Sequence, residues 1–193
     1  KTVIPIKVER NKTLITIKIG NVVIPDIILD TGYWYDGIMI YHPNYKDSLD
    51  LANAIETQIG GAGSGNASKA LMIDSTMCGL GNLMLNNQRI ILLQNDTFKG
   101  FPSNGIIGYS IFGHYVTEFD YDKNTMTLYD TNQIIIDSSW TDVPLYFKDN
   151  NIPWLDASVV IEKENPVTLS MYIDFAAGDP VLLLEKPEMK FSM

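Results

Sequence analysis

Two aspartates occupy matching places in the two halves of this sequence. Asp30 follows the apolar run 22–29 and opens the triplet Asp30-Thr31-Gly32, whereas Asp174 follows the run 167–173. A further apolar segment begins eight residues after each aspartate, at positions 38 and 182. Two carboxyl groups brought close together resist double ionisation and share one proton. Such a pair supplies a base that activates water and an acid that protonates a leaving nitrogen, which predicts hydrolytic chemistry.

The elements that must position these carboxyl groups are strands. Apolar and polar residues alternate with a period of two, most clearly over 13–19, and Gly20-Asn21 provides a turn into 22–29. Only 48–54 and 110–114 show a helical pattern, the second as a single turn. Many short strands and few helices predict an all-β fold. The other expected strands are 3–8, 37–41, 54–59, 70–77, 88–93, 115–121, 125–129, 143–147, 152–161, 167–174 and 181–184.

A polar segment at 137–142 separates two parts of the chain. The strand pattern restarts after it, and 155–160 with the following apolar run up to Asp174 corresponds to 14–19 with the run up to Asp30. The two aspartates lie 144 positions apart, which is a repeat of domain size rather than a solenoid period. We therefore expect one lobe over residues 1–137 and a partial second lobe of the same kind over 138–193.

A glycine-rich segment lies between the expected strands 54–59 and 70–77. Glycines at the tip of a hairpin ease its opening and let backbone amides approach a ligand. A surface hairpin without a ligand is the alternative interpretation. A phosphate-binding loop is not indicated, because no Gly-Lys-Ser/Thr follows. The segment reads Gly60, Gly61, Ala62, Gly63, Ser64 and Gly65.

The composition excludes several classes of partner. The 193 residues carry a net charge of −9, which disfavours binding to nucleic acid and to anionic membranes. No run approaches the roughly 18 apolar residues of a membrane span. The two histidines, His42 and His114, have no spaced set of metal ligands around them, so neither a metal nor a cofactor is expected. The single cysteine, Cys78, forms no intrachain disulfide and is expected to be a buried small side chain.

The order of the motifs resembles a known family. The Asp-Thr-Gly triplet, the glycine-rich hairpin and the segment Asn104-Gly105-Ile106-Ile107-Gly108 follow one another over the first 130 residues. Together they resemble one lobe of an aspartic protease of the retroviral, retropepsin-like type. They resemble more closely the bacterial proteins that carry two such lobes in one chain. The resemblance implies an acid-protease barrel lobe followed by a partial second lobe.

The resemblance also implies residue roles. Asp30 and Asp174 would form the catalytic pair, Thr31 would join a hydrogen-bond brace between the lobes, and Gly32 would allow close backbone approach. Ile106, Ile107 and Gly108 would form the loop that supports the catalytic loop. The flap over the substrate would be Ile59, Gly60, Gly61, Ala62, Gly63, Ser64 and Gly65, with Tyr33 beside it.

The function implied is that of an endopeptidase acting on an extended peptide or protein substrate, without a cofactor. The chain would be a monomer with two pseudosymmetric lobes rather than a homodimer in which Asp30 of one copy meets Asp30 of another. Two-lobed bacterial relatives are commonly exported, and a start at Lys1 is consistent with removal of a signal, so an extracytoplasmic location is expected.

Three departures from the family pattern leave an alternative open. Phe175 and Ala176 stand where the first lobe has Thr31 and Gly32, and Phe has no hydroxyl for the brace. Tyr33 replaces a small residue, and either fills the cleft, stacks on a ligand or packs under the flap. The sequence ends before a second flap or supporting loop. A degenerate protease homologue that binds peptide or serves a structural role is the alternative, with Asp174 only bonding local amides.

Overall fold

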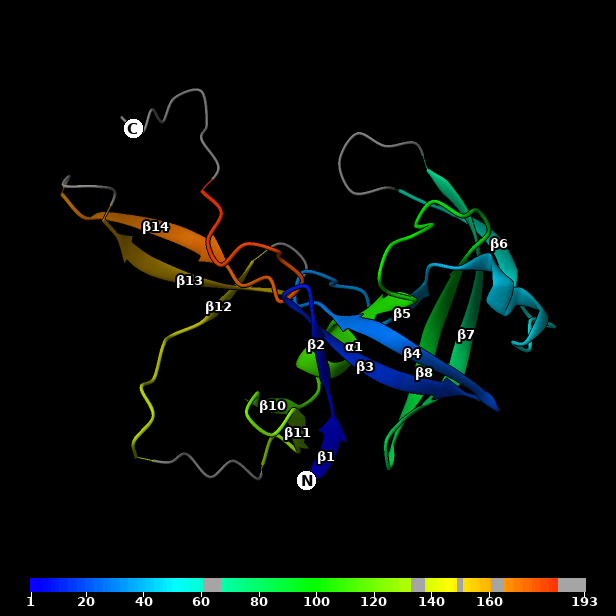
Figure 1. Cartoon of the computed structure of the whole chain (residues 1–193), viewed down its shortest axis with the longest axis horizontal. Coiled ribbons are helices and arrows are strands. Elements are labelled where there is room, and N and C mark those ends of the chain that lie inside the picture. Colours follow the sequence, from blue (N-terminus) through cyan, green and yellow to red (C-terminus); the bar gives the residue numbers. More distant parts are fainter. Residues whose placement is uncertain (61–66, 133–137, 149–150, 161–164, 184–193) are drawn as a thin grey trace.

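The computed structural model describes residues 1–60, 67–132, 138–148, 151–160 and 165–183, and it is predominantly β, as expected. Figure 1 shows the strands, one helical turn and a short 3-10 helix along the chain. The elements are β1 (Thr2–Pro5), β2 (Lys7–Glu9), β3 (Lys12–Ile19), β4 (Val22–Leu29), β5 (Gly37–Ile40), η1 (Pro43–Asp47), β6 (Ile55–Ile59), β7 (Ser68–Leu80), β8 (Leu83–Leu93), β9 (Gly105–Ile107), α1 (Tyr109–Phe112), β10 (Val116–Asp120), β11 (Thr125–Tyr129), β12 (Tyr146–Lys148), β13 (Ile152–Val159) and β14 (Val167–Tyr172).

An eight-stranded sheet holds most of the first 107 residues. Its order is β2-β3-β4-β9-β5-β8-β7-β6, and an additional pairing between β3 and β7 folds the sheet back on itself. The short strand β9 lies between β4, to which it is parallel, and β5, to which it is antiparallel. This insertion joins β9 to two strands that are distant from it in sequence, and it places residues 105–107 directly beside the end of β4.

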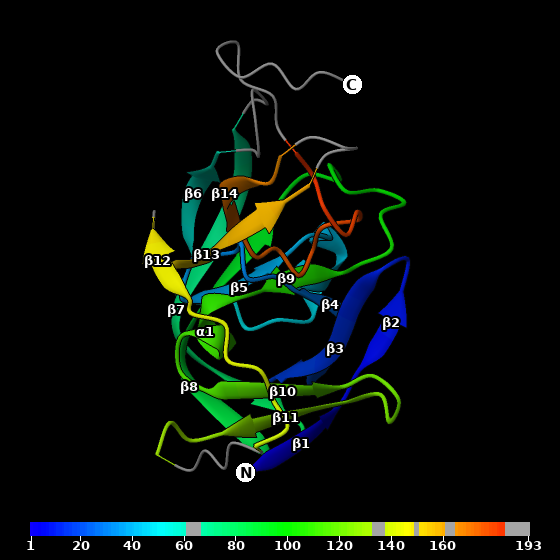
Figure 2. The ribbon, with the colours of Figure 1, turned by 90° about the vertical axis from the view of Figure 1, so that its left-hand side faces the viewer.

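Branched aliphatic side chains fill the interior of this sheet. Ile24, Ile27, Leu29, Ile38 and Ile90 are fully buried in one cluster with Ile107 and Ile111. A second sheet, β1-β11-β10, closes one end of the molecule, and its residues Ile4, Met126 and Leu128 join the same cluster (Figure 2). The alternation of buried and exposed residues along β3 is what the period of two predicts.

The third sheet, β12-β13-β14, has no such interior. Among the described residues from 138 onward, none is buried, and the core clusters contain no residue beyond Leu128. Figure 1 shows β13 and β14 extending away from the eight-stranded sheet. A three-stranded sheet alone cannot enclose a core, so its apolar side chains remain half-buried or exposed.

The order and register of this third sheet repeat those of β2-β3-β4. In the first part, β2 pairs with β3 and β3 with β4; in the second, β12 pairs with β13 and β13 with β14. The residue two positions before each aspartate makes an equivalent pair, Ile28 with Leu14 and Tyr172 with Trp154. Leu14 therefore corresponds to Trp154, one residue before the position 155 that the sequence comparison predicts. Both aspartates therefore follow the last strand of a matching three-strand unit.

Several local expectations differ from the structure. The strand expected over 3–8 is divided at Ile6, whose amide donates to the Asn124 carbonyl while β1 and β2 join different sheets. The helix expected at 48–54 is wrong, because the Asp50 carboxylate accepts the Ala52 amide in a turn that competes with helical bonds. The helical turn expected at 110–114 begins one residue earlier, at Tyr109.

The strands of the second part are shorter than expected. Residues 143–145 are not part of a strand, and β12 covers only Tyr146–Lys148. The described residues 181–183 form no strand, because no described strand lies alongside to pair with them. The expected hairpin at the glycine-rich segment is formed by β6 and β7, which pair antiparallel up to Ile59 and Ser68. Residues 61–66 lie outside the described residues.

Candidate active site

Asp30 directly follows the last residue of β4, and β9 braces it from behind. The Asp30 amide donates to the Ile107 carbonyl at 3.0 Å, and the Tyr109 amide donates to the Tyr33 carbonyl at 3.0 Å. Gly108 passes so close to this loop that a Cβ atom would lie 2.2 Å from the carbonyl oxygens of both Asp30 and Tyr33. The segment Ile106-Ile107-Gly108 therefore lies where the sequence predicts a supporting loop.

The loops that carry the two aspartates have the same hydrogen bonds. The Gly32 amide donates to Asp30 Oδ1 at 2.7 Å, and the Ala176 amide donates to Asp174 Oδ1 at 2.8 Å. The amide one residue further on donates to the aspartate's own carbonyl in both loops, at 3.1 Å from Tyr33 and at 3.2 Å from Ala177. Ala176 thus accommodates the conformation that Gly32 adopts, and each carboxylate is oriented by a backbone amide.

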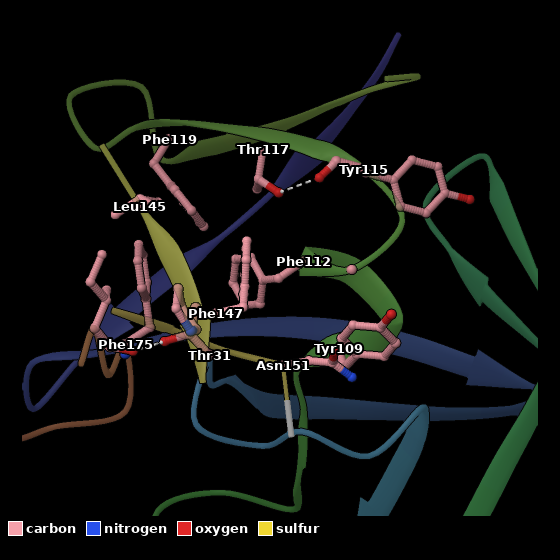
Figure 3. Close-up of a pocket in the computed structure, with 13 residues that line it drawn as sticks. Thr31, Tyr109, Phe112, Tyr115, Thr117, Phe119, Leu145, Phe147, Asn151 and Phe175 are labelled. Atoms are coloured by element: carbon pink, nitrogen blue, oxygen red, sulfur yellow. Dashed lines mark hydrogen bonds between the residues drawn. The ribbon is translucent and has the colours of Figure 1, made fainter. Parts of the chain in front are cut away.

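A single hydroxyl ties the two loops together. Thr31 Oγ1 donates to the Ile173 carbonyl at 2.5 Å and accepts the Phe175 amide at 3.1 Å. Figure 3 shows Thr31 and Phe175 side by side, with the bond between them dashed. Thr31 is only 8% exposed. Phe175 occupies the matching position in the second loop and has no hydroxyl, so it cannot make such bonds to the first loop. The Thr31 side chain therefore supplies the brace alone.

The two hydrogen bonds of the Thr31 hydroxyl should contribute to the stability of the fold. Replacing Thr31 with Val keeps the shape of the side chain but leaves the Ile173 carbonyl and the Phe175 amide without their partner. We expect the variant to lose about 2 kcal/mol of unfolding free energy, as is typical when one partner of a buried hydrogen-bonded set is removed. Urea unfolding measures this loss. Thr16→Val on the exposed face of β3 is the control and should change stability by less than about 0.5 kcal/mol. Equal stability of the two variants would contradict the assignment.

The environment of Asp30 favours its protonated form. Burial, followed by the negative charge of Asp174 and a side-chain hydrogen bond with Asp174, raises the pKa of Asp30 to about 6. The Gly32 amide and the positive charge of Lys12 act in the opposite direction. The Asp174 carboxyl group is thus near enough for its charge to act on Asp30.

A second prediction follows from this raised pKa. The folded protein keeps the Asp30 proton up to about pH 6, whereas an unfolded chain releases it near pH 3.9. Stability from this group is therefore complete below about pH 4 and falls as the pH rises to 6, by about 2–3 kcal/mol. We expect Asp30→Asn to be more stable than the parent by about this amount at pH 7, and equally stable at pH 4.

Urea unfolding at the two pH values measures this effect. Asp50→Asn is a matched control, because exposed Asp50 also accepts an amide two residues on, from Ala52 at 3.1 Å. The control should show no comparable gain at pH 7. A gain for Asp30→Asn that is the same at pH 4 and pH 7 would contradict the raised pKa.

Tyr33 lies inside the protein rather than in an open cleft. It is 9% exposed, its ring lies 5.9 Å from that of Tyr35, and its hydroxyl has no hydrogen-bond partner among the described residues. Of the interpretations open from the sequence, packing is the one that this burial favours. The half-exposed ring pair beside it is formed by Trp34 and Tyr35, which stack at 3.8 Å.

The base of the expected flap is in place. Ile59 ends β6 and packs against a small buried cluster that includes Tyr41, Ile91 and Leu93, and Gly60 is exposed. The residues Gly61, Ala62, Gly63, Ser64 and Gly65 lie outside the described residues. Tyr41 is close enough to Asp30 for the carboxylate charge to contribute to the raised pKa of its phenol, after the larger effect of burial. Sequence reasoning missed Tyr41, because nothing in its local pattern separates it from other tyrosines at the ends of strands.

A cavity of about 510 Å³ is lined by Thr31, Ile173 and Phe175, and neither Asp30 nor Asp174 lines it. Phe112, Phe119, Phe147 and Phe175 contribute aromatic side chains to its wall, as Figure 3 shows. The ring of Phe175 lies 4.9 Å from that of Phe119 and 5.6 Å from that of Phe112. At the position that matches Thr31, Phe175 therefore makes aromatic contacts with β10 and α1 in place of hydrogen bonds.

Ser110, Asp36 and His114 lie near one another but do not form a catalytic triad. Ser110 Oγ donates to Asp36 Oδ1 at 2.9 Å, and His114 Nε2 lies 3.2 Å from Asp36 Oδ2. Asp36 therefore bridges the serine and the histidine, and the histidine ring does not accept from the serine hydroxyl. Ser110 is also only 1% exposed. Burial raises the pKa of the Cys78 thiol to about 12, which argues against a nucleophilic role.

The described residues contain no group of three or more His, Cys, Asp or Glu side chains suited to a metal ion. In the part of the chain that the structure covers, no helix has the length and apolarity to cross a bilayer. No protein-family model matches the chain, and no curated protein matches it.

Proposed function

We propose that this protein is an aspartic endopeptidase with a retropepsin-like first lobe, which hydrolyses extended peptides with the pair Asp30 and Asp174. The observation that carries the proposal is the matched geometry of the two aspartate loops. Each carboxylate accepts the amide two residues on, and the Thr31 hydroxyl joins the loops across the axis between them. The raised pKa of Asp30 supports a pair that carries one proton.

The chemistry follows from that single shared proton. The ionised carboxylate takes a proton from a water molecule as its oxygen attacks the peptide carbonyl carbon. The protonated carboxyl group donates a hydrogen bond to the carbonyl oxygen, which gains negative charge in the tetrahedral intermediate. The intermediate collapses as the carbon–nitrogen bond breaks and a proton passes to the leaving nitrogen. One carboxyl group ends protonated and the other ionised, so the pair is restored.

The substrate would bind as an extended strand. Residues of the hairpin β6–β7 lie at the end of the eight-stranded sheet, where β6 is an edge strand. An extended peptide can add to such an edge through backbone hydrogen bonds. The acidic composition, with a pI near 4.5, and an exported location are compatible with work at mildly acidic pH. We propose that one chain is sufficient, since each chain brings both aspartates together.

The experiment that tests this function is digestion of an unfolded protein by the purified chain between pH 3 and pH 7. Mass spectrometry of the products would identify internal cleavage sites. A peptide in which a hydroxyl-bearing carbon replaces the scissile amide should inhibit, because it resembles the tetrahedral intermediate. No internal cleavage at any pH, with the inhibitor peptide failing to bind, would reject the proposal.

A second candidate function is that of a peptide-binding module without catalysis. The loss of the second hydroxyl at Phe175 and the absence of buried residues in the described part of 138–183 favour it. Binding of the inhibitor peptide without cleavage of any substrate would support this candidate over the first. Isothermal titration calorimetry with the same peptide separates the two.

A further inference from the structure

The tip of the β2–β3 hairpin contacts the second aspartate loop. Lys12 Nζ donates to the Ala176 carbonyl at 2.5 Å, and Asn11 Nδ2 donates to the Gly178 carbonyl at 3.2 Å. Figure 1 shows the segment that follows β14, in orange and red, beside the start of β3 in blue. These contacts join positions 164 and 167 residues apart, so local sequence does not explain them.

We propose that Asn11 and Lys12 form a clamp that positions the Asp174 loop and replaces the missing half of the threonine brace. The inference rests on the proposed function of Asp30 and Asp174. Thr31 fixes the front of the loop, at Ile173 and Phe175. The clamp binds two carbonyl groups further along the loop, those of Ala176 and Gly178. Together the three side chains hold the loop on both sides of Asp174, from Ile173 to Gly178.

The equivalent positions of the third sheet differ from the clamp at one residue. Asn11 and Asn151 occupy equivalent places at the start of β3 and β13, and both have a positive φ, of 60° and 66°. Ile152 stands where Lys12 stands, as the first residue of its strand. An isoleucine cannot donate a hydrogen bond from its side chain, so the first aspartate loop receives no tie equivalent to that of Lys12 from this position. Like the Thr31 hydroxyl, the lysine donates from the first lobe to the second.

The ammonium group also acts on the carboxyl pair through its charge. It favours the ionised form of Asp30, against the larger effects of burial and of the Asp174 charge. The titratable groups that face Asp30 are Asp174, Lys12 and Tyr41, the residue that follows β5. Lys12 is the only cation among these described groups. Lys12 is therefore a positioning residue that also adjusts the protonation of the pair.

Lys12→Met is the main test variant, because methionine keeps much of the aliphatic stem and removes the donor and the charge. Hydrogen exchange reports on the loop directly, since its amides donate to Thr31 Oγ1, Asp174 Oδ1 and the Asp174 carbonyl. We expect exchange at Phe175, Ala176 and Ala177 to become about tenfold faster, as expected for loss of one charge-assisted hydrogen bond. Lys12→Arg should restore slow exchange. Lys18→Met, an exposed lysine of the same strand, should leave it unchanged.

Asn11 requires a different substitution because of its backbone. Asn11→Gly removes the amide and keeps a residue that tolerates positive φ, whereas alanine would add strain. It should accelerate the same amides, most strongly Ala177, next to the Gly178 contact. Arg10→Gly is the matched control, because exposed Arg10 shares the turn with a φ of 50° and makes no contact with this loop among the described hydrogen bonds.

A second readout separates positioning from simple structural support. Titration of the Asp30 carboxyl carbon by NMR should show a higher pKa in Lys12→Met than in Lys12→Arg, because only the arginine keeps a positive charge. On a cleaved peptide, Lys12→Met should lower kcat by about tenfold with KM nearly unchanged. Unchanged exchange and unchanged titration in Lys12→Met would overturn the proposal. Altered exchange and titration in a chain that cleaves no peptide would uphold the clamp and reject the peptidase.

Discussion

Asp30→Asn should abolish peptide cleavage, with kcat reduced by about 10³-fold or more. The amide side chain can still accept the Gly32 N–H, which the carboxylate accepts at 2.7 Å, so the loop should keep its conformation. It can neither take a proton from water nor carry the shared proton to the leaving nitrogen. General acid–base catalysis typically contributes about 10²- to 10⁴-fold, and both roles are lost together. Single-turnover digestion followed by mass spectrometry measures the loss.

The control for this prediction uses another carboxylate with the same local bond. Asp50→Asn should retain full activity, because Asp50 lies on the surface and accepts only the Ala52 amide. Asp174→Asn should match Asp30→Asn. Retained activity in Asp174→Asn, combined with an active species of twice the chain mass, would point to pairing of Asp30 between two copies. Retained activity in Asp30→Asn itself would end the proposal of a carboxylate mechanism.

Gly108→Ala should be the most destabilising single change near the site. The new Cβ would lie 2.2 Å from the carbonyl oxygens of both Asp30 and Tyr33, and these are backbone atoms that cannot turn aside. Lack of space beside these two backbone oxygens is the cause. We expect a loss of about 3 kcal/mol or more, at the upper end for added volume in a packed interior. Urea unfolding and the near-ultraviolet circular dichroism of the folded variant report the change.

Gly60→Ala provides the matched control. A Cβ at Gly60 would meet no atom within 4 Å, and the residue has no positive φ. Its stability should stay within about 0.5 kcal/mol of the parent. If Gly108→Ala were as stable as Gly60→Ala, the segment 106–108 would not support the Asp30 loop as closely as described. If it folded but lost activity, close support would be needed for the geometry of the pair.

The strands near Asp30 could be predicted from the sequence because the pattern that indicates them lies in neighbouring residues. The alternation along 13–19 and the turn at Gly20-Asn21 predict β3 and β4 within one residue of their observed bounds. The expectation for 48–54 failed because a side-chain bond from Asp50 outcompeted a weak helical pattern. The two aspartates were found in the same way, each after an apolar run. The assignment of their roles to a peptidase stays a prediction.

The sequence by itself determined the all-β class, the hairpin around the glycine-rich segment and the repeat that relates Asp30 to Asp174. Each depends on alternation, turn residues or spacing, which are properties of neighbouring residues. Only the tertiary structure decided that β9 lies beside β4, that Thr31 braces the second loop alone, and that Lys12 reaches Ala176. These contacts join residues between 78 and 164 positions apart, and their formation depends on how whole sheets pack, which no local pattern of residue types specifies.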